Sequence, residues 1–355
     1  MKMKKYQIYE NSKENNNAGS KATKDVNLIG EQLGYSTLLL TERTIKSGFV
    51  GKAQRQLGYT HDWLSIYRSI ESDSIVFLQN PFRQRQIIRN RVLRLLKEKK
   101  NVKYISLVHD VEELRNIMDA DYYHDEFQFM LDHSDIFIVH NQVMKDYFIH
   151  KGIENDRIVV LEIFDYLQTY KPHLPRFSTS VVIAGNLDHV KSKYILELYK
   201  IHDIHFELFG SNYSCDKAPN VHYNGTVSAE NLPKYLSNGF GLVWDGDRID
   251  TCCGNTGEYL KYNDPHKLSL YLSSGLPVII WKQAAEAPMV EAYGIGICID
   301  SLYELKNILN GISAEEYAHY AHAVSCIAPK LCNGSFLQQA IHDAESRLQT
   351  LFEED

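Results

Sequence analysis

The feature that most constrains this chain's fold is a regular alternation of short apolar runs with longer stretches of helical periodicity. This alternation is typical of βα units, whose parallel strands form a sheet covered by helices. In the first half, the sequence predicts strands at residues 6–9, 36–40, 74–79, 104–109, 136–139 and 158–160. Helices are predicted between them at residues 22–33, 83–99, 123–134 and 141–151. Asn141 is suited to be the N-cap of the last helix, and Gly152 to end it.

A proline-punctuated connection, which contains Pro172 and Pro175, then interrupts the pattern. The alternation begins again after it, with strands predicted at residues 180–184, 205–209, 239–244, 277–281 and 297–299. Single cores rarely grow beyond roughly 250–300 residues. We therefore predict two α/β domains, residues 1–172 and 173–334, followed by a helix at 335–352. Ligands bind outside the carboxyl ends of parallel strands, so the site is expected in a cleft between the domains.

Composition and charge disfavour several classes of protein. The net charge of −7 and the isoelectric point of about 6.1 disfavour nucleic acid as a partner. No apolar run approaches the roughly 18–20 residues that span a bilayer, and the start lacks the apolar segment of a secretory signal. The six cysteines include no CxxC pair, which indicates neither a zinc site nor a disulfide framework. We expect a cytoplasmic protein.

The most informative stretch is residues 260–281. Asp264 is suited to cap a helix, and Pro265 to occupy its first turn. The free N–H groups and partial positive charge of such a helix end accommodate a phosphate. Lys267 and His266 would add side-chain donors there. The alternative is an ordinary capped helix with a solvated lysine, although a lysine in the first turn opposes the helix dipole.

Three blocks in the second half, residues 241–245, 262–272 and 275–279, resemble bacterial glycosyltransferases of the GT-B superfamily. The resemblance is strongest to β-1,6-galactofuranosyltransferases of surface-polysaccharide pathways. It is weaker to streptococcal glucosyltransferases that extend N-acetylglucosamine on serine-rich adhesins. Residues 107–111 and 184–187 fit the same pattern.

The resemblance implies a GT-B fold, in which two Rossmann-like domains face each other across a cleft. It implies that residues 173–334 bind the nucleotide sugar, that residues 1–172 bind the acceptor, and that the helix 335–352 returns to the first domain. The expected reaction is inverting transfer of a hexosyl unit, galactofuranosyl above all, from a UDP-sugar to a saccharide acceptor. The acceptor would be carried on a lipid or a protein, and the enzyme would be cytoplasmic, free or at the inner face of the membrane.

Other functions remain open at this stage. One is a glucosyl- or N-acetylglucosaminyltransferase that acts on a glycoprotein, and another is a different use of a nucleotide sugar, such as epimerisation. A third is a non-catalytic partner subunit of a glycosyltransferase complex. No metal or other cofactor is expected, because Lys267 and the helix end would neutralise the leaving diphosphate. Relatives suggest a homo-oligomer, a dimer or tetramer.

Candidate site residues follow from the strand ends and this helix. The predicted donor-binding residues are Gly185, Asn186, Phe209, Gly210, Asp245, Asn263, Asp264, His266, Lys267, Leu268 and Ser269. Asp110, slightly preferred, and His109 are the candidates for the base that deprotonates the acceptor hydroxyl. The predicted acceptor-binding residues are Asn16, Asn17 and Gly19, in a polar loop after the first strand.

Each candidate has a structural alternative. His109 could pack in the core and Asp110 could cap the next segment, while glycines after strands also make ordinary βα turns. Asp245 and Asp247 have the spacing of a metal-binding DxD pair, but we favour contact between Asp245 and a sugar hydroxyl. Residues 248–259 are expected to form a mobile loop over the site.

Overall fold

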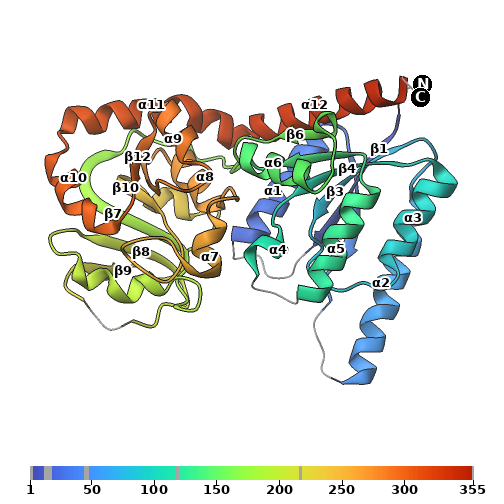
Figure 1. Ribbon diagram of the computed structural model, residues 1–355, viewed down its shortest axis with the longest axis horizontal. Helices are drawn as coiled ribbons and strands as arrows, with labels where there is room; N and C mark the ends of the chain where they lie inside the picture. Colours follow the sequence, from blue (N-terminus) through green and yellow to red (C-terminus); the bar gives the residue numbers. More distant parts are fainter. Residues whose placement is uncertain (1–2, 12–17, 44–47, 117–119, 216–217, 354–355) are drawn as a thin grey trace.

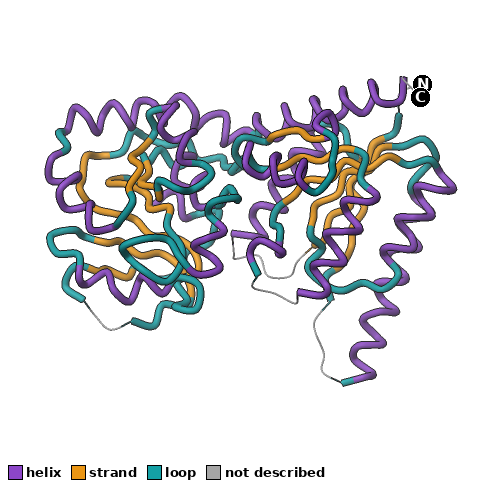
Figure 2. Tube along the Cα trace, in the orientation of Figure 1, coloured by secondary structure: helices purple, strands orange, loops and turns teal. Residues whose placement is uncertain are grey.

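The computed structural model describes residues 3–11, 18–43, 48–116, 120–215 and 218–353. It consists of two α/β lobes that lie side by side (Figure 1), and in each lobe helices enclose a central sheet (Figure 2). Each sheet has six strands, all parallel to their neighbours. The predicted α/β class and two-sheet organisation are therefore correct.

The first sheet has the strand order β2-β1-β3-β4-β5-β6. Its strands are β1 (Lys5–Asn11), β2 (Ser36–Thr41), β3 (Ile75–Asn80), β4 (Lys103–Val108), β5 (Ile136–Val139) and β6 (Ile158–Val160). The helices of this lobe are α1 (Ala18–Gln32), α2 (Phe49–Ser69), α3 (Arg89–Lys100), α4 (Glu112–Arg115), α5 (Ala120–His133), α6 (Gln142–His150) and the 3₁₀ turn η1 (Asn155–Arg157). The central strands β3, β4 and β5 are buried at nearly every position, as expected for a parallel sheet covered on both faces, whereas β1 and the edge strand β2 keep polar or exposed residues.

The second sheet has the order β12-β11-β10-β7-β8-β9. Its strands are β7 (Arg176–Asn186), β8 (Phe206–Ser211), β9 (Val221–Tyr223), β10 (Asn238–Val243), β11 (Val278–Trp281) and β12 (Gly296–Ile299). The helices are α7 (Gly254–Tyr259), α8 (His266–Ser273), α9 (Ala287–Tyr293), α10 (Leu305–Gly311) and α11 (Ala314–Asn333), with 3₁₀ segments η2 (Lys193–Lys200), η3 (Leu232–Tyr235) and η4 (Leu302–Glu304).

The last helix, α12 (Ser335–Glu353), returns to the first lobe (Figure 1). Gly334, with φ of 85°, separates it from α11. The Asp165 carboxylate accepts hydrogen bonds from the backbone N–H groups of Phe336 and Leu337, 3.3 and 2.7 Å, and so caps the helix. Its apolar face joins the core that the first sheet forms with α1.

The elements that the sequence did not predict include α2, β9 and α7. α2 begins with ten residues that bury no side chain and include Gly51 and Gly58, so its start lacks a clear apolar stripe. β9 has three residues, too few for a periodic pattern. The short helix α7 lies in the stretch 248–259 that was expected to be a mobile loop. The predicted N-cap is confirmed, since Asn141 Oδ1 accepts from Met144 N at 2.9 Å.

Candidate functional site

Lys267 lies in the first turn of α8, next to the carboxyl end of β10. Its Nζ donates to the Trp244 carbonyl and to Asp245 Oδ1, both at 2.9 Å. The Lys267 and Asp245 side chains are 16% and 8% exposed, so the pair is largely but not fully enclosed. An ammonium has three protons, and these contacts use two. The third finds no acceptor among the described residues.

α8 is also tied to the neighbouring strand β7, because Tyr271 Oη accepts from Ala184 N at 2.8 Å. The next residue, Gly185, has φ of 133°, and a Cβ there would meet nothing within 4 Å. The end of β7 therefore faces open space beside α8. Asn186 Oδ1 holds this turn, since it accepts from Asp188 N at 3.1 Å and from Asn212 Nδ2 at 2.9 Å.

Gly210, at the end of β8, serves packing. Its φ is 152°, and a Cβ there would lie 1.7 Å from the Gly185 carbonyl oxygen. Phe209 turns away from the strand ends and lines a cavity of about 350 Å³ on the face of the sheet, with Tyr235 and Glu207 among its neighbours. The Phe209 side chain therefore packs on the sheet, and a donor contact by the backbone of Phe209 and Gly210 stays a prediction.

Asp264 differs from the prediction, because it caps no helix. Pro265 is the residue before the first turn of α8, and no side chain caps that turn. Asp264 is buried, its Oδ2 accepts from Phe164 N at 2.6 Å, and its N–H donates to His140 Nδ1 at 3.3 Å. Burial raises the pKa of Asp264 to about 7. The carboxyl group therefore connects the two domains, and its predicted contact with the nucleotide sugar stays a prediction.

His266 belongs to the same connection. Its ring lies 5.2 Å from that of Tyr166 and 6.4 Å from that of Phe164, centroid to centroid. Neither ring nitrogen makes a hydrogen bond of ordinary geometry with the described residues, and both are closed to solvent. Burial, helped by the charge of Lys21, lowers the pKa of His266 to about 3, so the ring is neutral. In this arrangement the His266 ring packs between the domains, and its contact with a diphosphate stays a prediction.

Leu268 and Ser269 are fully buried in the body of α8, so their side chains do not face the cleft either. Asn263 keeps part of its surface exposed, but its Oδ1 is enclosed and accepts no hydrogen bond from the described residues. Of the predicted donor residues, Gly185, Asn186 and Lys267 thus remain at the rim between β7 and α8. Asp245 orients the lysine.

The two candidate bases follow β4 in the first lobe. The His109 ring stacks on Phe164, with centroids 5.3 Å apart and planes 4° apart. Its Nε2 lies 2.9 Å from Gln79 Oε1, while Gln79 Nε2 donates to the Thr23 carbonyl at 3.2 Å. Since that carbonyl only accepts, Oε1 is the atom facing His109, which assigns the proton to Nε2 and a lone pair to Nδ1.

The environment keeps the His109 imidazole neutral. Burial, with smaller contributions from the nearby His140 and Arg83, lowers the pKa of His109 to about 3. Asp110 is more open, with 34% of its side chain exposed, and its Oδ2 is paired with Arg115 Nη1 at 2.8 Å. One carboxylate oxygen, Oδ1, is left for an incoming hydroxyl.

On the acceptor side, Asn16 and Asn17 lie outside the described residues, and Gly19 lies in the first turn of α1. The structure adds Glu10, which the sequence did not single out, at the end of β1. Its two oxygens accept from Arg83 N at 3.1 Å and Gln86 Nε2 at 2.8 Å. Burial raises the pKa of Glu10 to about 7. The alternation of strands and helices could not predict this buried carboxylate, because the residues that contact it, Arg83 and Gln86, come from a different loop.

Two bridges that the sequence did not reveal hold the domains together. From α7, Tyr259 Oη accepts from Val111 N, and Asn255 Nδ2 donates to the Asn116 carbonyl, each at 2.8 Å. The segment 248–259 is thus an ordered contact with the first lobe. Elsewhere, Asn141 Nδ2 donates to buried Glu286 Oε1 at 2.7 Å. Burial, followed by the charge of Asp264, raises the pKa of Glu286.

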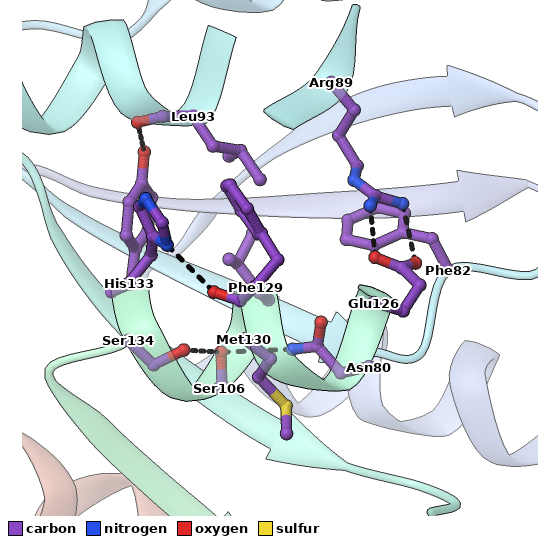
Figure 3. A pocket seen from close by; sticks show the side chains of 12 residues that line it. Asn80, Phe82, Arg89, Leu93, Ser106, Glu126, Phe129, Met130, His133 and Ser134 are labelled. Atoms are coloured by element: carbon purple, nitrogen blue, oxygen red, sulfur yellow. Dashed lines mark hydrogen bonds and ion pairs between the residues drawn. The ribbon is translucent and has the colours of Figure 1, made fainter. Parts of the chain in front are cut away.

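A further cavity lies inside the first lobe but is too small for a substrate, at about 10 Å³. Figure 3 shows its polar side chains satisfied by one another. Arg89 pairs with Glu126, and Asn80 Nδ2 donates to Ser106 Oγ at 3.0 Å. Among the described residues, no group of three or more His, Cys, Asp or Glu side chains is arranged to hold a metal ion. None of the described helices is long and apolar enough to cross a membrane.

Comparison with known proteins agrees with this architecture. Residues 5–163 match the model of the glucosyltransferase 3-like N-terminal domain, and residues 181–344 match that of the C-terminal domain. The β-1,6-galactofuranosyltransferase WbbI of Escherichia coli K12 is 34% identical over 251 residues, 69% of this chain and 72% of that protein. Glucosyltransferase 3 of Streptococcus gordonii is 27% identical over 335 residues, 91% of this chain and 92% of that protein.

Solved structures share the two-domain fold at low identity. The Anabaena protein HepE, in complex with UDP and glucose, has a TM-score of 0.59 and 13% identity over 99% of each chain. Sucrose-phosphate synthase from Thermosynechococcus elongatus has a TM-score of 0.62 and 10% identity over the whole of both chains. The fold is thus GT-B, as predicted. The chain belongs to the glucosyltransferase 3-like family and is a glycosyltransferase.

Proposed function

We propose that this chain transfers a hexosyl unit, with inversion, from a UDP-sugar to a saccharide acceptor in the synthesis of a surface polysaccharide or glycoconjugate. The observation that carries the proposal is the Lys267 ammonium, held by Trp244 and Asp245 at the start of α8. A UDP-sugar releases a diphosphate, and fixed positive charge beside it lowers the barrier to its departure. Lys267 and the helix N–H groups would supply that charge without a metal ion or other cofactor.

We propose galactofuranosyl as the transferred unit, and the 34% identity to WbbI supports this choice. The alternative is a glucosyl or N-acetylglucosaminyl unit transferred to a glycoprotein. The similarity to Glucosyltransferase 3 of Streptococcus gordonii, which extends over 91% of this chain, favours that alternative. Turnover of UDP-galactofuranose and UDP-glucose by the purified protein separates the two, since the true donor is consumed faster.

The acceptor side of the proposal rests on the first lobe. The end of β4 brings His109 and Asp110 close to residues that contact the second lobe: His109 stacks on Phe164, whose N–H donates to Asp264, and Val111 N donates to Tyr259 of α7. A saccharide held there would offer its hydroxyl to one of these groups. We propose that the acceptor is carried on a lipid or protein, and that the enzyme is a cytoplasmic dimer or tetramer. Light scattering of the purified protein tests the oligomeric state.

Thermal denaturation with added nucleotides tests the donor site. A ligand that binds only the folded protein raises its Tm, so UDP and the UDP-sugar donor should do so, with or without EDTA. Lys267→Ala should lower UDP affinity about 10- to 100-fold, because a charge-assisted hydrogen bond is lost. Lys306→Ala, an exposed lysine on α10, is the matched control and should bind normally.

Two results would count against the proposal. If no UDP compound raises the Tm of the wild-type protein, donor binding is wrong, and the chain is better explained as a non-catalytic subunit. If Lys267→Ala binds UDP as tightly as wild type, the diphosphate lies elsewhere in the cleft.

A further inference from the structure

The first half of α2 projects from the body of the first lobe (Figure 1). The buried residues of this helix begin only at Tyr59. Before it, Phe49, Val50 and Leu57 are 86%, 68% and 70% exposed. Leu57 follows Val50 by seven residues and Phe49 by eight, so all three lie on one side of the helix. Large apolar side chains gathered in this way usually mark an interaction surface.

A neighbouring loop adds a fourth apolar side chain. Gln56 Nε2 donates to the Arg85 carbonyl at 2.8 Å, and Ile87 N donates to Gln56 Oε1 at 3.0 Å. These bonds hold Ile87, which is 74% exposed, beside the projecting helix. We refer to Phe49, Val50, Leu57 and Ile87 together as the apolar tip.

The chain segment that contains the apolar tip is rich in cations, and Lys52 and Arg85 lie within a few residues of the tip in the sequence. Residues 48–100 contain eleven Lys and Arg against four Asp and Glu, a net charge of +7 in a chain whose total is −7. Lys52, Arg85 and Arg91 are exposed and form no ion pair within the described parts of the chain. A basic segment with bare apolar side chains complements a surface that is anionic outside and apolar beneath.

We propose that the apolar tip and its cations attach the acceptor domain to a bilayer that contains anionic phospholipids. The four apolar side chains would enter the boundary between headgroups and acyl chains, while Lys52, Arg85 and Arg91 contact lipid phosphates. A second copy of this chain fits the surface less well, because a symmetric contact would bring Lys52, Arg85 and Arg91 of one copy close to those of the other. The inference does not depend on the identity of the donor sugar.

The attachment has a consequence for the acceptor. The tip belongs to the same lobe as the candidate bases at the end of β4. Docking this lobe, and not the donor lobe, would bring a membrane-borne saccharide toward the acceptor side of the cleft.

Co-sedimentation with vesicles tests the proposal. The full chain should bind vesicles of phosphatidylcholine with phosphatidylglycerol, bind pure phosphatidylcholine at least tenfold more weakly, and dissociate as salt rises. The variant Phe49→Ser/Val50→Ser/Leu57→Ser should lose at least tenfold in partitioning, and so should Lys52→Glu/Arg85→Glu. Leu174→Ser, at an apolar residue 67% exposed outside this surface, is the matched control and should bind like wild type.

Folding and self-association are checked in the same samples. Both multiple variants should retain the Tm of the wild-type protein, since the altered side chains are exposed in the described part of the chain. Equal vesicle binding by wild type and the triple variant would overturn the proposal. It would also be overturned if wild type ignored all vesicles while the triple variant changed an oligomer into monomers in light scattering, because the tip would then be a contact between copies.

Discussion

At the residue scale, the two side chains after β4 are held in different ways, and this decides how each could act as a base. Asp110 has one oxygen paired with Arg115 and the other available. His109 is neutral, with Nδ1 as its lone-pair atom, but its pKa of about 3 makes it a weak base in the unliganded protein. We therefore keep Asp110 as the first candidate.

Asp110→Asn removes the proton-accepting charge while it keeps the size of the side chain. We expect kcat to fall about 100-fold or more, with the Tm increase caused by UDP unchanged. Steady-state turnover and thermal denaturation measure the two effects. Undiminished turnover would remove Asp110 from this role and direct attention to His109 Nδ1, for which His109→Gln is the corresponding variant.

Gly185 and Gly210, at the ends of β7 and β8, allow a matched pair of alanine substitutions. A methyl group at Gly210 would strike the Gly185 carbonyl, so Gly210→Ala should destabilise the fold by about 2–4 kcal/mol. At Gly185 the methyl group meets open space, and Gly185→Ala should cost only about 1 kcal/mol of backbone strain while weakening UDP binding. Urea denaturation and UDP titration measure these effects. Equal stabilities of the two variants would contradict the packing argument.

At the scale of elements, α12 is the part of the second half that completes the first core. Ile341 is fully buried among residues of that core. Ile341→Ala should lower the free energy of unfolding by about 2–5 kcal/mol, through lost burial and the cavity left behind. Chemical denaturation measures the loss, with exposed Gln349→Ala on the same helix as control. A loss as small as that of the control would show that α12 detaches from the lobe.

At the scale of the whole molecule, a buried carboxyl group lies where the two domains join. The pKa of Asp264 is about 7 in the folded protein, above its ordinary value of 3.8, because burial disfavours the charge. Between these values the folded state binds a proton that the unfolded state has lost. This group therefore favours folding at acidic pH, and its contribution is lost as the pH rises through about 7.

Asp264→Asn keeps an acceptor for Phe164 N but carries no charge at any pH. We expect the Tm of the variant, relative to that of wild type, to be higher at pH 8 than at pH 5. Thermal denaturation across this range measures the difference, and Asp343→Asn on the exposed face of α12 is the control. A pH-independent difference would mean that Asp264 does not titrate in the domain connection.

The sequence by itself determined the α/β class, the two sheets and most strand positions, and it predicted a donor site at residues 262–272, because these follow from periodicity and local motifs. Lys267 belongs to that group, since a lysine in a first helical turn is a local signal. Only the tertiary structure decided that Asp264 and His266 face Phe164 and the other domain. A short stretch of sequence defines where a helix begins, but which side of it faces a ligand and which faces a neighbouring domain depends on residues a hundred positions away.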